Sequence, residues 1–233
     1  MARIAPRPQP RGSPLAVGRE RPPRGRGAVS GRKPTPRPRR SAGSARPAPS
    51  KGALRIVAGR AGGRRIDAPP GSGTRPTSDR VREAVFNALD SLDAIEGARV
   101  LDAFAGSGAL GIEALSRGAA HATFFDTDPQ AVEIATRNLS TLGLAADATV
   151  VARAAERSLA PGGPFDLVLL DPPYAYDGWD DLLVAVARAL SADGVVVIES
   201  DREVPLPAGL VGIKSKAYGG TVVQFATVAG APS

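Results

Sequence analysis

A carboxylate, two prolines and an aromatic ring follow one another late in the chain, in Asp171-Pro172-Pro173-Tyr174. The apolar run before them, residues 165–170, predicts a buried strand. The prolines end that strand because each fixes φ and neither offers an N–H to a sheet ladder. The rigid turn that results could hold a flat ring bearing an amine, with oxygen acceptors for its N–H groups and an aromatic face beside it. The alternative is a plain strand end, in which the aspartate caps the next turn and the tyrosine packs on the rim.

A glycine-rich loop follows an earlier predicted strand, residues 98–101. Gly106, Gly108 and Gly111 fit the G-x-G-x-x-G pattern of dinucleotide-binding loops, which bring a pyrophosphate to a helix N-terminus. Asp102, however, stands immediately before this loop and places a carboxylate where a dinucleotide carries its anions. S-adenosylmethionine suits that position better, because it carries an ammonium and a sulfonium and no phosphate. The loop alone leaves a dehydrogenase as the alternative, and the 171–174 turn favours an amino methyltransferase.

The next predicted strand, residues 122–125, is followed by two further carboxylates. Asp126 could accept both ribose hydroxyls of the same ligand, and Asp128 is placed to cap the following helix. A strand-end cap is the simpler interpretation of Asp126. The predicted cofactor contacts from the two loops are Asp102, Ala103, Phe104, Ala105, Gly106, Ser107, Gly108, Asp126 and Thr127.

The composition limits the classes of protein and of site. With 233 residues, 42% of them hydrophobic, the chain is long enough for one domain with a substantial core and an appendage. It has no cysteine and one histidine, so we expect no disulfide, no metal site and a reducing cytoplasmic location. The histidine, His121, is expected to be a partly exposed strand residue. No apolar stretch approaches the ~20 residues that a membrane-spanning helix needs.

The net charge of +7 is distributed unevenly. Residues 1–52 carry +13, residues 53–82 carry +5, and residues 83–233 carry −11. Because an acidic core repels a polyanion, we expect a nucleic acid to bind the N-terminal third; a solvated basic face is the alternative. The candidate RNA-binding side chains are Arg55, Arg60, Arg64, Arg65, Arg75, Arg80 and Arg82.

Residues 1–52 contain 11 of the 22 prolines and few apolar residues. Such a segment cannot bury enough surface to offset its ordering entropy, so we expect it to be disordered. Three interpretations stay open: a basic arm that holds RNA, a targeting segment, or a start-site artefact with the true start near Leu54. The dense prolines argue against an amphipathic targeting helix.

Residues 53–92 are predicted to form a small extension. Two short strands, residues 54–58 and 64–66, flank a glycine turn, and a helix is predicted over residues 77–89. The apolar stripe of this helix consists of Val81, Val85, Phe86 and Leu89, with Arg80 and Arg82 off it.

Residues 93–233 alternate between strand and helix patterns, which predicts an α/β domain with a mostly parallel sheet. Gly219-Gly220 separates the last two strands and predicts an antiparallel hairpin at the sheet edge. The predicted strands cover residues 98–101, 122–125, 148–152, 165–170, 194–199, 211–216 and 221–228, and the predicted helices 109–117, 129–142 and 179–190.

From about Arg55 to Val228 the chain resembles the RsmD-type methyltransferases of bacteria. The resemblance lies in residues 55–59, 74–83, 101–111 and 113–119 and in the 171–174 turn, and the arginine-rich stretch before the sheet is its most specific part. It implies a class I, Rossmann-like S-adenosylmethionine-dependent methyltransferase fold. It also implies methyl transfer to the exocyclic N2 of a guanine in small-subunit (16S) rRNA, either naked or in an assembling 30S particle.

For such a substrate we expect the following roles. Asp171 and the Pro172 carbonyl would accept the two N–H groups of the guanine amine, with Pro173 bracing the turn and the base stacked on Tyr174. The resemblance implies that Thr77 would close over the methionine end of the cofactor. Similar proteins often hold the adenine amine with a polar residue after the third strand, where this chain departs from the pattern and Ala154 offers only backbone groups. We expect a monomer. Methylation of DNA bases or of a protein glutamine, and a catalytically inactive RNA-binding module, are the alternatives.

Overall fold

The computed structural model describes residues 54–69, 76–155, 159 and 163–230, although not the side chains of residues 76–78. The expectations for the N-terminal tail, for Arg75 and for the Thr77 side chain lie outside the described residues. In the described part of the chain, no helix has the length and apolar character to cross a membrane.

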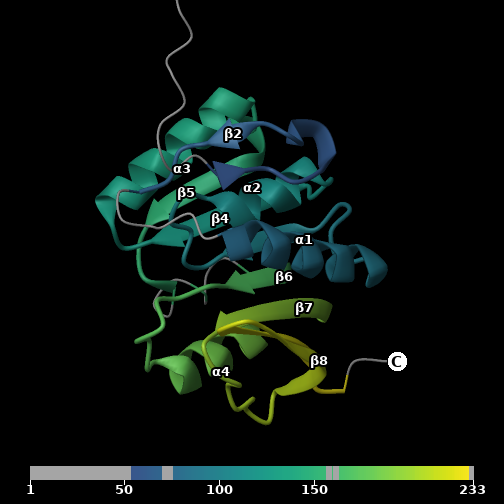
Figure 1. The fold of residues 1–233 in the computed structure, drawn as a ribbon. Coiled ribbons are helices and arrows are strands. Elements are labelled where there is room, and N and C mark those ends of the chain that lie inside the picture. The colour runs from purple at the N-terminus through teal and green to yellow at the C-terminus, as the bar shows by residue number, and fades with distance from the viewer. Residues whose placement is uncertain (1–53, 70–75, 156–158, 160–162, 231–233) are drawn as a thin grey trace, which may run out of the picture. The chain divides into compact units, whose positions relative to one another are not determined.

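A seven-stranded sheet forms the centre of the fold, with strand order β5-β4-β3-β6-β7-β9-β8 (Figure 1). The first five of these are parallel, whereas β9 runs antiparallel to both β7 and β8. This confirms the mostly parallel sheet with a C-terminal antiparallel hairpin. The strands are β3 (Arg99–Asp102), β4 (His121–Asp126), β5 (Ala148–Ala152), β6 (Phe165–Leu170), β7 (Leu190–Ser200), β8 (Leu210–Tyr218) and β9 (Thr221–Val228).

Helices cover both faces of the sheet. One face packs against α1 (Pro76–Ser91), α2 (Ala109–Ser116) and α3 (Pro129–Leu142), and its core includes Phe124. The other face packs against α4 (Trp179–Ala189). A short 3-10 helix, η2 (Ala145–Asp147), leads into β5. The predicted bounds hold for α3, β5, β6 and β9, whereas β7 begins earlier than predicted because Leu190 already pairs with Phe165.

The N-terminal extension contains β1 (Leu54–Arg55) and β2 (Arg65–Ile66), paired antiparallel, with η1 (Gly59–Ala61) between them. The first strand is shorter than predicted, because the Glu113 carboxylate accepts the N–H groups of Val57 and Ala58 at 2.7 and 3.0 Å. The division into residues 53–92 and 93–233 stays a prediction, since the described residues all belong to one compact unit.

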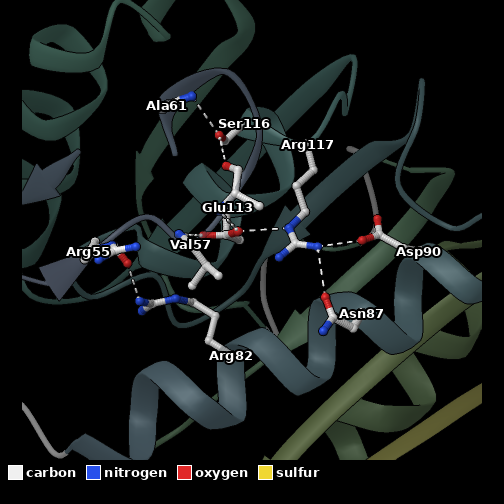
Figure 2. A network of polar contacts seen from close by, with 10 residues as sticks. Arg55, Val57, Ala61, Arg82, Asn87, Asp90, Glu113, Ser116 and Arg117 are labelled. Atoms are coloured by element: carbon white, nitrogen blue, oxygen red, sulfur yellow. Dashed lines mark hydrogen bonds and ion pairs between the residues drawn. The ribbon is translucent and has the colours of Figure 1, made fainter. Parts of the chain in front are cut away.

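Glu113 of α2 is 0% exposed and joins three parts of the fold (Figure 2). Besides the backbone of the extension, its carboxylate accepts Arg117 Nε at 2.9 Å. The Arg117 guanidinium continues to Asp90 of α1 at 2.5 Å and lies over the Phe86 ring at 5.3 Å. Since every acceptor position of a buried carboxylate needs a donor, this network fixes α1, α2 and the extension relative to one another.

Helix α1 corrects one expectation. Val81, Val85, Phe86 and Leu89 are buried as predicted, but Arg82 is also buried, with 5% of its surface exposed. Arg82 precedes Val85 and Phe86 by three and four residues, which places it on the same helix face. Its Nη2 donates to the carbonyl of Arg55 at 2.5 Å and to Asp79 at 2.7 Å. Arg82 is therefore a buried structural cation, and its prediction as an RNA-binding surface residue is wrong.

Replacing Glu113 with alanine leaves Nε of the largely buried Arg117 and two backbone N–H groups without their acceptor. We expect Glu113→Ala to lower the free energy of unfolding by about 3–5 kcal/mol, the range for breaking a buried ion pair. Urea denaturation would measure it. The matched control is Glu133→Ala on α3, whose carboxylate is 75% exposed and lies 3.7 Å from Arg137. A loss below about 1 kcal/mol in Glu113→Ala would contradict the role given to the network.

Candidate active site at the carboxyl ends of the parallel strands

Four carboxylates stand at the ends of four neighbouring parallel strands. Asp126 ends β4, Asp102 ends β3, Asp171 follows β6 and Glu199 lies near the end of β7. Along the pairing registers these residues are separated by even numbers of positions, so their side chains share the face covered by α1, α2 and α3. Asp126, Asp102, Asp171 and Glu199 are called the carboxylate row below.

Asp102 is the most enclosed member of the row, with 1% of its surface exposed. Its Oδ2 accepts the N–H of Gly111 at 2.9 Å, whereas Oδ1 is buried and has no hydrogen-bond partner among the described residues. Desolvation raises the pKa of Asp102 to about 7, and the charges of Asp171 and Asp126 add to the effect. The site therefore contains a buried acceptor that a cationic donor would satisfy.

The glycine loop brings backbone close to this row. Gly108 has φ 79° and precedes α2 as its N-cap residue. At Gly111 a Cβ atom would lie 2.3 Å from Cε1 of Phe124, so a side chain there would separate α2 from β4. Ser107 and Ala105 are buried, while Phe104 and Gly106 are partly exposed. The loop thus presents backbone rather than side chains beside Asp102.

The Asp126 carboxylate accepts two hydrogen bonds from the protein backbone. Its Oδ2 accepts the N–H of Gly106 at 2.7 Å, and its Oδ1 accepts the N–H of Asp128 at 2.9 Å. These bonds connect the ends of β3 and β4, as the cap interpretation expects, and each oxygen keeps a second lone pair for a ligand. Asp128 accepts the N–H of Gln130, which confirms the predicted cap of α3.

The turn after β6 combines an anchored part and an exposed part. Pro172 is buried, Pro173 is exposed, and the Pro173 carbonyl accepts the N–H of Tyr176 at 2.8 Å. Tyr174 is 41% exposed and its hydroxyl lies 3.2 Å from the Thr221 hydroxyl on β9. The tyrosine ring is accessible, and its far end is fastened to the antiparallel hairpin.

Three aromatic side chains pack against one another between this turn and the glycine loop. The Phe104 and Tyr176 rings meet edge to face at 5.3 Å, and Tyr176 meets Trp179 in the same way at 5.3 Å. These contacts connect the glycine loop with the start of α4. The two loops that carry the predicted cofactor and acceptor residues are therefore packed against each other.

The two remaining members of the row have raised pKa values. Desolvation by the surrounding protein raises the pKa of Asp171 to about 6, although the residue keeps exposed surface. Desolvation, and then the charge of Asp171, raise the pKa of Glu199 to about 8, while the Arg82 charge opposes the increase. Glu199 was not predicted as a site residue, because in the sequence it follows an apolar run as a solvated strand end would. The signal that could have identified it is its register with Asp171 on the neighbouring strand.

Five of the predicted RNA-binding arginines remain after the buried Arg82 and the undescribed Arg75 are set aside, and they form two groups. Arg60 pairs with Asp147, and Arg64 donates to the carbonyls of Thr141 and Leu142, so both fasten the extension to the sheet domain. Three others are exposed, and two of these are direct cross-strand partners: Arg55, Arg65 and Arg80. The adjacent like charges of β1 and β2 favour an anion between them.

The carboxylate row suits an extended organic cation. Among the described residues, no three His, Cys, Asp or Glu side chains converge closely enough to hold a metal ion. A cation with several N–H groups would instead satisfy Oδ1 of Asp102 and lower the repulsion between neighbouring carboxylates.

His121, which lies 3.0 Å from Thr149, is a half-buried strand residue as expected.

The raised pKa of Asp102 predicts a pH-dependent stability. An aspartate that holds its proton more tightly when folded destabilises the fold as pH rises from about 4 to about 7. Asp102→Asn removes the charge but keeps an oxygen for Gly111. We expect its Tm to match that of the wild type near pH 4, where the penalty has not yet developed, and to exceed it at pH 8 by at least about 2–4 °C. Calorimetry against the exposed control Asp193→Asn tests this; equal Tm values at pH 8 would show that burial of the charge is harmless.

Comparison with known proteins identifies the family. A family model described as "Conserved hypothetical protein 95" matches residues 54–227. The Bacillus subtilis protein YlbH is 41% identical over 181 residues, which cover 74% of this chain and 97% of that protein. The "Ribosomal RNA small subunit methyltransferase D" of Escherichia coli is 40% identical over 159 residues, 67% of this chain and 79% of that protein.

A solved structure agrees with the sequence matches. The Escherichia coli protein yhhF, whose structure is described as "Putative methyltransferase yhhF", superimposes with a TM-score of 0.68 at 37% identity, over 76% of this chain and 98% of that chain. Together with the order of the strands, this confirms the class I, Rossmann-like methyltransferase fold. The chain belongs to the RsmD family of ribosomal RNA small subunit methyltransferases.

Proposed function

We propose that this protein transfers a methyl group from S-adenosylmethionine to the exocyclic N2 of a guanine in small-subunit rRNA. The observation that supports it most directly is the carboxylate row, which ends at a turn with acceptor oxygens and an exposed aromatic ring. Membership of a family whose Escherichia coli relative is named for the small-subunit rRNA supports the substrate class.

The residues of the first two loops fit the cofactor. Oδ1 of Asp102, a buried acceptor to which none of the described residues donates, would take the ammonium, directly or through a water. The backbone of residues 103–108 would face the methionine portion, Asp126 and Thr127 the ribose, and the backbone at Ala154 the adenine. When bound, the cofactor supplies an electrophilic methyl group on a sulfonium. Thr77 is proposed to close the methionine end.

The turn after β6 would position the acceptor. Asp171 and the Pro172 carbonyl would each accept one N–H of the guanine amine, which directs the nitrogen lone pair towards the methyl donor. Tyr174 would stack on the base, an interaction worth about 1–3 kcal/mol for each base. The guanine amine is a weak nucleophile, so positioning is the main contribution, and up to ~7–11 kcal/mol is available from it in favourable cases.

Two substitutions at Asp171 separate its roles. Asp171→Ala removes the acceptor and should lower kcat by at least about a thousandfold, while calorimetry still detects S-adenosylmethionine binding. Asp171→Asn keeps one acceptor oxygen and should retain partial activity. The matched control is Asp177→Asn, at an exposed position in the following loop. Single-turnover transfer of a labelled methyl group to small-subunit rRNA gives the rates, and wild-type turnover in Asp171→Ala would refute the assignment.

The exposed arginines of β1, β2 and α1 are proposed to hold the RNA backbone. Substituting Arg55, Arg65 and Arg80 with alanine should raise the KM for RNA and leave kcat almost unchanged, because these side chains contact phosphates rather than the reacting base. The slope of log K against log salt should fall by about 0.7 for each phosphate that an arginine no longer neutralises. Arg188→Ala on α4, an exposed change on the opposite face of the sheet, is the control. An unchanged salt slope in the triple variant would exclude this surface.

A further inference from the structure

Glu199 is a carboxylate that the proposed mechanism does not use. It directly follows Ile198, the register partner of Leu170, just as Asp171 directly follows Leu170. The two carboxylates therefore end adjacent parallel strands, about 4.8 Å apart along the direction of the sheet's hydrogen bonds, and face the same side. Glu199 is half-buried, and no hydrogen bond or ion pair reaches its carboxylate from the residues that the structure describes.

None of the described residues donates a hydrogen bond to the Glu199 carboxylate, although charged groups lie near it. Asp171 repels its negative charge, and Arg82 attracts that charge while its ion pair is with Asp79. The Nε–H of Arg82 is itself buried and meets no acceptor in the described part of the chain. In the protein alone the pKa of Glu199 is raised to about 8, so the carboxyl holds a proton at neutral pH. An N–H donor from a ligand, or a cation in the row, would favour the ionised form.

The acceptor base offers such a donor only if it is guanine. Guanine carries its N1–H directly beside the N2 amine, so two adjacent ring positions both donate. Adenine and cytosine present an unprotonated ring nitrogen, an acceptor, beside their exocyclic amines. Two neighbouring carboxylates therefore complement guanine, and a carboxylate facing a ring lone pair repels the other two bases.

We propose that Glu199 accepts the N1–H of the acceptor guanine while Asp171 holds the N2 amine, and that Glu199 thereby determines the base specificity. The inference rests on the proposed function. Glu199 would be a specificity-determining contact to the substrate, and Arg82 would keep its charge in place from the buried side of α1. Discrimination by one well-placed base contact corresponds to at least about a tenfold preference.

The test compares guanine with 2-aminopurine, which keeps the N2 amine but has a lone pair at N1 instead of a hydrogen and carries no oxygen at C6. The change of preference in Glu199→Gln therefore reports the N1 contact separately from any contact to O6. RNA fragments of the small subunit are prepared with either base at the acceptor position, once mass mapping has located it. The rate kcat/KM and the equilibrium RNA affinity without methyl donor are both measured at about pH 8.5, where ionised Glu199 predominates. Wild-type protein should prefer guanine by at least about tenfold in both measurements.

The variant Glu199→Gln should reverse this preference in part. Its amide can donate to N1 of 2-aminopurine, so the ratio of guanine to 2-aminopurine should fall at least about tenfold. Glu203→Gln, an exposed change four residues further along, should keep the wild-type ratio. A merely structural role of Glu199 would lower both rates together and leave the ratio constant.

Each outcome decides one question. If wild-type protein methylates guanine but treats 2-aminopurine equally, the role of Glu199 is refuted whether or not the glutamine variant folds. An unchanged ratio in a folded Glu199→Gln variant refutes it as well. If the wild type transfers no methyl group to guanine N2 in small-subunit rRNA, the proposed function itself fails.

Discussion

The constraint on which this structure depends is the register of its parallel strands. β4, β3, β6 and β7 pair so that their carboxyl ends align, and an even offset places four carboxylates on one face. A slip of one residue in any strand would turn its carboxylate to the other face. The apolar cores on both sides of the sheet oppose that slip, because the same shift would remove Phe124 and its counterparts from the core into which they pack.

The carboxylate row is unfavourable for the protein alone. The charges of Asp171 and Asp126 raise the pKa of Asp102, the charge of Asp171 raises that of Glu199, and Asp102 keeps one buried oxygen that no described residue satisfies. Natural proteins accept such arrangements at sites where a ligand supplies the missing charge. The carboxylate row therefore favours the binding of cations and N–H donors. The packing of the rest of the fold offsets the unfavourable free energy of burying these carboxylates.

The extension contributes to the site through buried ionic contacts rather than through its own small sheet. Glu113 joins the extension to α2, and Arg117 carries the connection to α1 (Figure 2). Helix α1 then places Arg82 behind the carboxylate row, near Glu199. The exposed arginines of β1, β2 and α1 and the carboxylate row consequently belong to one continuous structure.

The sequence by itself was sufficient to predict the α/β sheet, the glycine loop and the turn at Asp171, because each depends on local chemistry: apolar periodicity, backbone freedom at glycine, and the rigidity of proline. The cap at Asp128 was predictable for the same reason. Only the tertiary structure decided where the side chains of Arg82, Glu113 and Glu199 lie and what surrounds them. Their surroundings come from segments distant in the chain, and burial, which sets whether a charged side chain is solvated or must find a partner, is a property of packing and not of spacing.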